Sequence, residues 1–143
     1  MIRTYLTLIR EFRPSSDSEK VVALLTECGL LEHEADIIRE EIAMKHSKNP
    51  QLFLVYDLGG KIVGTVIGGW DGWRGWIYKL GVSPEHRREG IGSALVTEAV
   101  RRLKELGAKR IGAYAFANND ASVSLFKKNG FTELDVRFLR LRL

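Results

Sequence analysis

Several features are scarce or missing in this sequence of 143 residues. Its one cysteine, Cys28, excludes an internal disulfide, and no CxxC or Cys/His spacing indicates a zinc site. No apolar run approaches the roughly 20 residues of a membrane span, and residues 1–12 lack the apolar core of a signal peptide. Low-complexity stretches and internal repeats are also missing. We therefore expect a soluble cytoplasmic protein with no metal and no membrane partner.

Positive charge is not concentrated in one tract of the chain. Lysine and arginine number 22 against 18 aspartate and glutamate, which gives a net charge of +4. This balance suits an anionic ligand, but the basic residues are interspersed and do not form the basic tract typical of nucleic-acid binding. The length fits one domain over residues 1–143, and no nucleic-acid partner is expected.

Hydrophobic periodicity predicts an α/β domain with helices packed on a mixed sheet. The clearest helix covers residues 91–106, where apolar residues recur every three or four positions before the stop at Gly107. The last strand is predicted from the alternation of leucine with arginine after residue 138. In chain order the expected elements are strand 6–12, a helix ending near 27, helix 32–47, strands 51–56, 61–67 and 76–82, helix 91–106, strand 110–115, a short helix ending near 129 and strand 136–143.

The loop that joins the 76–82 strand to the 91–106 helix carries the clearest chemical signal. It reads Arg87-Arg88-Glu89-Gly90-Ile91-Gly92-Ser93. A helix start has unpaired backbone N–H groups that a diphosphate can satisfy, and the arginines add positive charge. Glycine at 90 and 92 removes Cβ atoms that would hold an anion away from the backbone. The loop is therefore predicted to bind a phosphate-bearing ligand.

Two common phosphate-binding motifs fit this loop less well. A P-loop needs Lys followed by Ser or Thr after its last glycine, whereas Ser93 and Ala94 follow Gly92. A Rossmann fingerprint needs glycine or alanine at position 95, which is Leu95. The plainest alternative is a glycine turn that only starts a helix.

Residues 80–93 resemble the acetyl-CoA signature of the GNAT family of N-acetyltransferases, with its Arg/Gln-x-x-Gly-x-Gly/Ala core. Residues 117–120 and 125–131 resemble the second motif of that family. The run 68–75 is also similar to a bacterial subgroup, the YpeA-like acetyltransferases. The resemblance implies a GNAT-like mixed, mostly antiparallel sheet of six to seven strands flanked by about four helices.

Carried over by position, the resemblance also implies a site for acetyl-CoA. The backbone amides of residues 88–93 would hold the pyrophosphate, and residues 80–82 would border the pantetheine arm. The amide at or beside Val82 would stabilise the oxyanion that forms when an amine attacks. The implied cofactor-binding residues are Leu80, Gly81, Val82, Arg87, Arg88, Glu89, Gly90, Ile91, Gly92, Ser93, Asn119 and Phe126.

The groups that move protons are less well defined. Many family members carry a tyrosine acid seven residues after the asparagine, where this chain has Phe126. Tyr114 or a water is left as the candidate acid. Family members with a carboxylate base on the fourth strand would need it near Trp76, so Asp71, Glu85 and a water relay remain as candidate bases.

Three tryptophans lie within seven residues, at Trp70, Trp73 and Trp76. They are hypothesised to line an aromatic acceptor pocket that holds an apolar or cationic group. The alternative is that one or two of them cover the core or a dimer interface.

Together these features predict an N-acetyltransferase that moves an acetyl group from acetyl-CoA directly to a primary amine. The alternative is a non-catalytic acyl-CoA sensor or interaction module. The expected partners are acetyl-CoA and an unidentified amine acceptor. A homodimer is a further possibility because dimers are the common default.

Overall fold

A twisted five-stranded sheet forms the centre of the computed structural model, which describes residues 8–31 and 35–143. The strands follow chain order across the sheet. They are β1 (Ile9–Glu11), β2 (Phe53–Leu58), β3 (Lys61–Trp70), β4 (Gly75–Val82) and β5 (Ile111–Ala113). The pairings from β1 to β4 are antiparallel, and β4 pairs with β5 in parallel. The sheet is therefore mixed and mostly antiparallel, as expected.

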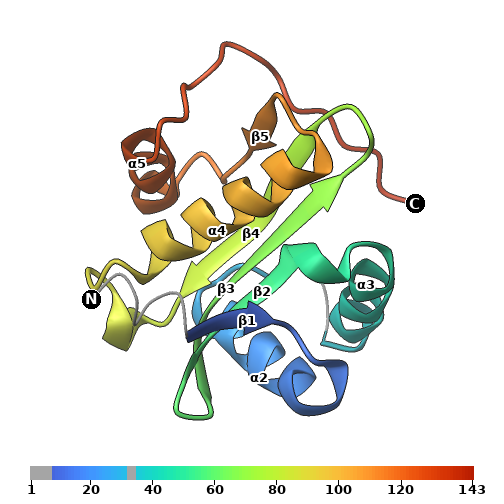
Figure 1. The fold of residues 1–143 in the computed structure, drawn as a ribbon, viewed down its shortest axis with the longest axis vertical. Helices are drawn as coiled ribbons and strands as arrows, with labels where there is room; N and C mark the ends of the chain where they lie inside the picture. The colour runs from blue at the N-terminus through green and yellow to red at the C-terminus, as the bar shows by residue number, and fades with distance from the viewer. Residues whose placement is uncertain (1–7, 32–34) are drawn as a thin grey trace.

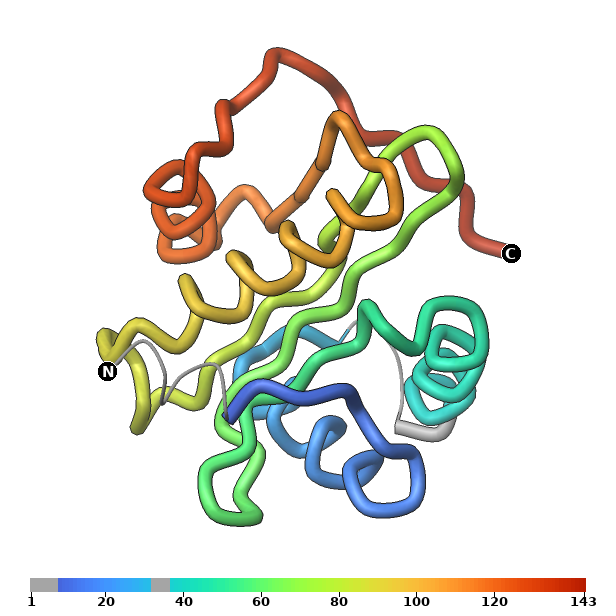
Figure 2. Tube along the Cα trace, viewed as in Figure 1, coloured from blue at the N-terminus to red at the C-terminus, as the bar shows by residue number. Residues whose placement is uncertain are grey.

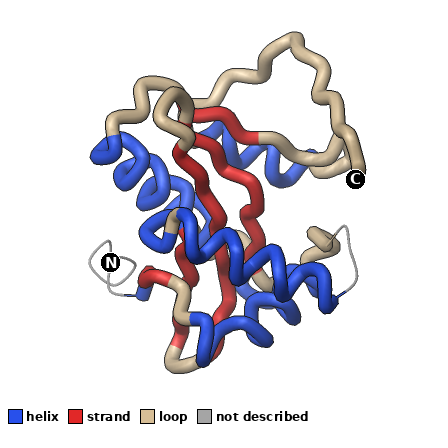
Figure 3. Tube along the Cα trace, turned by 90° about the vertical axis from the view of Figure 1, so that its right-hand side faces the viewer, coloured by secondary structure: helices blue, strands red, loops and turns tan. Residues whose placement is uncertain are grey.

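Over the described residues, four α-helices cover the two faces of the sheet (Figures 1 and 3). They are α2 (Pro14–Glu27), α3 (Ala35–Lys48), α4 (Ile91–Leu106) and α5 (Asp120–Lys128). Two short 3-10 helices, η1 (Pro50–Leu52) and η2 (Pro84–His86), precede β2 and follow β4. One core cluster packs residues of α4 and α5 against the sheet, and a second packs those of α2 and α3 against it. Strands β2 and β3 are buried from both sides, which explains their continuous apolar runs.

Helix α4 has the amphipathic pattern that the sequence predicted. Its apolar stripe, which includes Leu95, Ala99 and Leu103, is fully buried. The helix ends at Gly107, whose left-handed backbone (φ 109°) lets the chain reverse toward β5. Because α4 starts next to the end of β4, the predicted phosphate loop lies at one end of the sheet.

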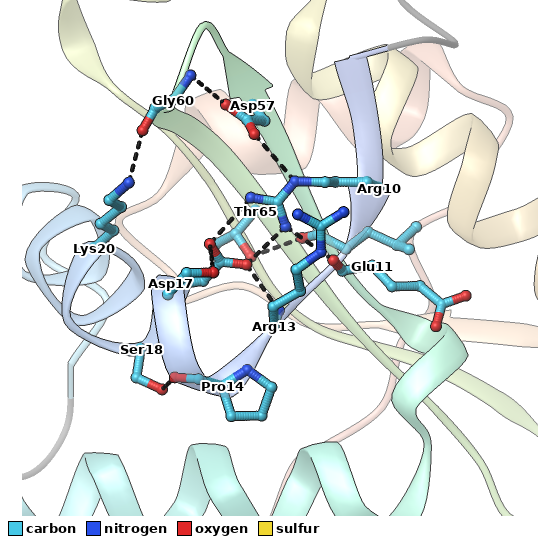
Figure 4. Close-up of polar contacts among 12 residues, drawn as sticks. Arg10, Glu11, Arg13, Pro14, Asp17, Ser18, Lys20, Asp57, Gly60 and Thr65 are labelled. Atoms are coloured by element: carbon cyan, nitrogen blue, oxygen red, sulfur yellow. Dashed lines mark hydrogen bonds and ion pairs between the residues drawn. The ribbon is translucent and has the colours of Figure 1, made fainter.

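A buried carboxylate joins β1, α2 and β2 (Figure 4). Asp17 accepts two hydrogen bonds from the Arg10 guanidinium, at 2.7 and 3.0 Å, and one from the backbone N–H of Arg13 at 2.7 Å. Arg10 also donates to Asp57 at 3.0 Å. Burial alone would raise the pKa of Asp17, but these hydrogen bonds outweigh it, so the pKa is lowered.

The sheet differs from the prediction at its two ends. Five strands are formed over the described residues, not six to seven, because residues 136–143 pair with no strand there. The leucine/arginine alternation is compatible with a strand, but a strand also needs a neighbouring backbone in register. At the other end, the predicted 6–12 strand is shortened to Ile9–Glu11, and its first two residues lie outside the described part.

Candidate functional site

A cleft opens where β4 and β5 separate. The two strands pair only over three residues, from Gly75↔Ile111 to Ile77↔Ala113, and β4 then continues to Val82 without β5 beside it. The cleft is lined by residues 77–80 of β4, residues 114–116 after β5, one face of α5 and Leu30. It therefore exposes one edge of β4 for five residues.

The register of β4 on β3 fixes which backbone groups face this cleft. The Ser83 N–H donates to the Val63 carbonyl at 2.8 Å, and Val82 lies opposite Gly64. Residue pairs in an antiparallel ladder alternate between bonded and non-bonded, so Val82 belongs to a non-bonded pair. Its N–H and C=O, like those of Leu80 two residues earlier, consequently point away from β3 toward the open edge.

The Val82 carbonyl at this edge is already occupied. It accepts from the Cys28 thiol, with Sγ at 3.4 Å, and from Arg87 Nε at 3.2 Å. Burial raises the pKa of Cys28, so the thiol remains protonated near neutral pH and suits a structural role. The contact joins the end of α2 to β4 beside the site, although Cys28 and Val82 are far apart in sequence.

The loop before α4 has an unusual backbone conformation. Arg88 has φ 64°, a left-handed backbone in a residue that is not glycine, and Gly90 at the N-cap of α4 has φ 82°. Such a conformation costs about 1–3 kcal/mol in a residue with a side chain and is concentrated at functional sites. No side chain caps α4 there, so the N–H groups of residues 91–93 remain available to an anion.

Gly92 serves a different purpose from the one predicted. A Cβ at this position would come within 2.7 Å of Leu125 Cδ2 and 3.6 Å of Val82 Cγ2. The space that glycine provides therefore faces α5, and it permits close packing of α4 against that helix. Gly90 has a positive φ of 82°, which favours glycine, and the close approach of an anion to residues 90 and 92 stays a prediction.

The other loop residues are held by local contacts. The Glu89 carboxylate lies 3.1 Å from His86 Nδ1, which donates to it in the tautomer that carries a proton there. Ile91 is buried in the core, whereas Ser93 Oγ accepts from Asn129 Nδ2 at 3.1 Å. The side chains of residues 87 and 88, both arginines, are exposed. The loop thus combines outward-facing cations with a helix start that is anchored on α5.

Asn119 and Phe126, which the resemblance gives as cofactor-binding residues, both line the cleft. Asn119 also caps α5, because its Oδ1 accepts from the Ser122 N–H at 3.2 Å. The cap leaves the Asn119 side-chain amide as a further donor. Phe126 is buried and packs against Phe131, with ring centroids 5.1 Å apart. The position that holds a tyrosine in many family members therefore lies inside the cleft. In this chain it is a phenylalanine, which has no hydroxyl group to donate a proton.

Two tyrosines face each other in the same cleft. Tyr78 of β4 and Tyr114 after β5 meet edge to face, with centroids 6.4 Å apart. Burial raises the pKa of Tyr78, with Tyr114 and Asp71 contributing further. Lys45 of α3 lies over the Tyr78 ring, 5.1 Å from its centroid. A Cβ on Gly69 would be 3.1 Å from the Tyr78 hydroxyl, so this hydroxyl lies over β3, on the side away from β5.

Neither carboxylate named as a candidate base lines the cleft, although Asp71 Oδ2 accepts a long hydrogen bond (3.4 Å) from the Trp76 indole N–H beside it. Asp71 organises the β3–β4 turn, where its Oδ1 accepts from the backbone N–H groups of Trp73 (2.8 Å) and Arg74 (2.7 Å). The Arg74 and Trp73 amides lower the pKa of Asp71, which makes it a weaker base. Glu85 is exposed in η2 and pairs with Lys61 at 3.5 Å, at the phosphate-loop end of β4.

The three tryptophans do not line one pocket. Trp70 and Trp73 border a hollow together with Gly107, Lys109 and Arg110, and Trp73 is 73% exposed. Trp76 lies on Gly112 of β5, where a Cβ would come within 2.7 Å of its ring. Its neighbour Ile77 lines the β4–β5 cleft. Trp76 is therefore beside the cleft, whereas Trp70 ends β3 and Trp73 lies in the turn between β3 and β4.

Several residues of the cleft were not identified from the sequence. Alternation along β4 does not predict the direction of Tyr78, because the register on β3 shifts there: Gly68 pairs with Ile77 and Ile67 with Lys79, so Tyr78 is the extra residue. Leu30 and Cys28 carried no local signal, because they reach β4 only through the packing of α2. Glu27, the last residue of α2, lies next to Cys28 in the chain and accepts a long hydrogen bond (3.4 Å) from Ser83 Oγ.

Metal binding and membrane insertion find no support in the part of the chain that the structure describes. Within 8–31 and 35–143, no group of three or more His, Cys, Asp or Glu side chains is arranged to hold a metal ion. Over the same ranges, no helix is long and apolar enough to cross a membrane.

Comparison with known proteins gives consistent matches over most of the chain. Residues 14–131 match the model of the acetyltransferase (GNAT) family. An acetyltransferase of Pectobacterium atrosepticum is 38% identical over 135 residues, which is 94% of each chain. One of Sodalis glossinidius is 38% identical over 120 residues, covering 84% of this chain and 83% of the relative.

Solved structures agree with this fold. Ard1 from Thermoplasma volcanium superposes with a TM-score of 0.77 at 27% identity, covering 87% of this chain and 81% of that protein. The PaiA N-acetyltransferase from Thermoplasma acidophilum was solved in complex with coenzyme A. It superposes with a TM-score of 0.75 at 23% identity, covering 90% of this chain and 91% of that protein.

Proposed function

Since the chain belongs to the GNAT family of acetyltransferases, we propose that it transfers an acetyl group from acetyl-CoA directly to a primary amine. The observation that carries this proposal is the exposed edge of β4, with the Leu80 and Val82 backbone groups facing the cleft. This edge leads into the loop of residues 87–93, which suits a pyrophosphate.

The two parts of the site suit the two parts of acetyl-CoA. The uncapped amides at the start of α4, with Arg87 and Arg88 nearby, favour the pyrophosphate. At the edge of β4, the N–H and C=O groups of Leu80 are offered to the pantetheine amides, as they would be to an added peptide strand. The PaiA structure contains coenzyme A on a similar fold, which supports this assignment.

The Val82 N–H is the proposed oxyanion donor. In the reaction the amine nitrogen attacks the thioester carbonyl carbon, the C–S bond breaks, the amine loses a proton and the departing thiolate gains one. A backbone donor held rigidly by the β3–β4 ladder stabilises the developing negative charge without reorganisation. Because Phe126 supplies no proton, Tyr114 is the protein group in the cleft that we propose as the acid.

The acceptor amine is proposed to enter beside Trp76 and Tyr78. Because neither Asp71 nor Glu85 lines the cleft, a water relay is the proposed route for the ammonium proton. The acceptor must lose this proton before attack, because an ammonium nitrogen has no lone pair. Trp70 and Trp73 are left out of the proposed acceptor site.

A screen for coenzyme A thiol release tests this proposal. The protein is incubated with acetyl-CoA and a panel of amines, peptides and small metabolites, and products are identified by mass spectrometry. We expect acceptor-dependent thiol release with an N-acetylated product. Products acetylated on oxygen, or loss of acetyl-CoA only to water, would contradict it.

One observation favours a second function, a non-catalytic acyl-CoA sensor. The position of the usual tyrosine acid holds a buried phenylalanine, Phe126. Both functions predict coenzyme A binding, so calorimetry with coenzyme A cannot separate them. Binding without thiol release over the whole panel would favour the sensor.

A further inference from the structure

Two consecutive residues of β4, Tyr78 and Lys79, face the same side of the sheet. The register of β4 on β3 shifts at this point, so Tyr78 is an extra residue, and such a bulge re-aims the side chains around it. The Tyr78 ring meets Lys45 of α3, and Lys79 Nζ donates to the Leu30 carbonyl, which follows α2, at 2.8 Å. Both side chains therefore face the α2 and α3 side. Figure 2 shows α3 and α4 on opposite sides of strands β3 and β4.

The Tyr78 ring lies over Gly69 of β3. A Cβ on Gly69 would be 2.7 Å from Tyr78 Cε2, so a larger residue would displace the ring. The same point is 3.0 Å from Lys45 Nζ. The Lys45 ammonium group is thus held between α3, the backbone of β3 and the face of an aromatic ring.

Lys45 is a partly buried cation whose contacts among the described residues include no anion. Its ammonium group donates to the Asn49 side-chain carbonyl at 3.0 Å and lies 5.1 Å from the centroid of the Tyr78 ring, and both partners are uncharged. Burial lowers the pKa of Lys45, and over the described residues no charged group contributes to this shift. Buried lysines are usually paired with an anion. This cation is therefore suited to an anion that arrives with a ligand.

Tyr78 connects this cation to the proposed site of acetyl transfer. The residue lines the β4–β5 cleft together with Leu80, whose backbone faces the pantetheine in the proposed function. Trp76 lies beside the same cleft on Gly112. An acceptor whose amine enters beside Trp76 and Tyr78 would bring its other groups next to Lys45.

We propose that Lys45 binds a carboxylate of the acceptor, so that the acceptors of this protein are aminocarboxylic acids such as amino acids. The inference rests on the proposed acetyl transfer and extends its site from the cleft to α3. A single ammonium group matches the single negative charge of a carboxylate. Lys79, held by the Leu30 carbonyl, adds positive potential on the same side of β4 and favours the approach of an anionic acceptor. Amines with further positive charge, such as polyamines, are disfavoured for the same reason.

Matched pairs of acceptors test the role of Lys45. The common α-amino acids and 4-aminobutyrate are each compared with their own carboxamides, which keep the amine and lose the negative charge. Thiol release gives kcat/KM for the wild type and for Lys45→Met, which keeps an unbranched apolar stem and removes the cation. The matched control is Lys48→Met, which removes an exposed lysine from the same helix.

We expect Lys45→Met to lower kcat/KM about 30-fold for the acids that the wild type acetylates, the effect of losing one hydrogen-bonded charge. The value for the carboxamides should change by less than about threefold, and Lys48→Met should leave both classes unchanged. Each acceptor is compared between two proteins, so the intrinsic reactivity of its amine cancels.

An equal loss for acids and carboxamides, in a Lys45→Met variant with an unchanged melting temperature, would overturn the inference. Lys45 would then only support the Tyr78 ring. A wild type that acetylates polyamines and none of the aminocarboxylic acids would overturn it as well.

Calorimetry separates a failure of this inference from a failure of the proposed acetyl transfer, because it needs no turnover. With coenzyme A bound, the wild type should bind at least one of the acids at least tenfold more tightly than its carboxamide, and Lys45→Met should bind the two alike. Such binding without thiol release would support the carboxylate site and contradict acetyl transfer. No difference between acid and carboxamide for any pair would overturn the carboxylate site.

Discussion

Tyr78 and Tyr114 meet edge to face in the β4–β5 cleft, with ring centroids 6.4 Å apart. Tyr78 belongs to β4 and Tyr114 follows β5 directly, and the two rings have different surroundings. The Tyr78 hydroxyl lies over Gly69 of β3, near Lys45, whereas Tyr114 belongs to the stretch that borders the free end of the cleft. Their roles in proton transfer should therefore differ.

Tyr114→Phe should lower kcat by about 100-fold, since a positioned acid contributes roughly 10²–10⁴-fold. Tyr78→Phe is the matched control and should change kcat by less than about fivefold. Steady-state kinetics with a fixed acceptor measure both, and calorimetry should show unchanged coenzyme A affinity. Equal rates for Tyr114→Phe and wild type would leave water as the acid.

Val82→Pro removes the proposed oxyanion donor, because proline has no N–H. This N–H points away from β3, so the β3–β4 ladder loses no hydrogen bond. We expect kcat to fall about 10²–10³-fold, the effect of losing one oxyanion donor. Val82→Ala, which keeps the N–H, should retain most of the activity. A proline variant that folds and turns over normally would assign the donor elsewhere.

Gly92→Ala tests whether this glycine serves helix packing or anion binding. The added Cβ would meet Leu125 Cδ2 at 2.7 Å, so we expect α5 to shift and stability to fall by about 1 kcal/mol. Leu125→Ala makes room and should restore much of the coenzyme A affinity in the double variant. Chemical denaturation and calorimetry over the double-mutant cycle measure the coupling. Additive effects of the two substitutions would argue against packing.

Asp17→Asn should destabilise the fold by about 2 kcal/mol at neutral pH, because it leaves Arg10 without its buried charged partner. The folded pKa of Asp17 lies below its ordinary value of 3.8, so the wild-type advantage is present above that pH. It should shrink as the pH falls below about 4 and the carboxylate takes up a proton. Urea unfolding of both proteins between pH 7 and pH 2.5 measures the difference, and a constant difference would contradict this role.

Substitution of Trp76 and substitution of Trp73 should differ in their effect on the KM for the acceptor. Trp76→Ala removes the ring that lies on Gly112 beside the cleft, and it should raise the acceptor KM about tenfold, a loss of ~1.4 kcal/mol of binding. Trp73→Ala, at a side chain that is 73% exposed, should leave the acceptor KM and the stability unchanged. Equal effects of both substitutions would favour a single aromatic pocket.

Much of the fold could be predicted from local patterns. Helix α4, its stop at Gly107 and the hairpin of β2 and β3 were each indicated by residues within a few positions of one another. These features depend on contacts between near neighbours, which the order of residues specifies directly.

The tertiary structure alone decided which side chains meet. Cys28 bonds to the Val82 carbonyl, and Gly92 makes room for Leu125, although each pair is separated by more than thirty residues. The 136–143 segment has the alternation of a strand, yet it pairs with none of the described strands. Periodicity specifies the side of a segment that is apolar. The partner is decided by the packing of the whole chain, because backbone hydrogen bonds and side-chain contacts require a second surface in register.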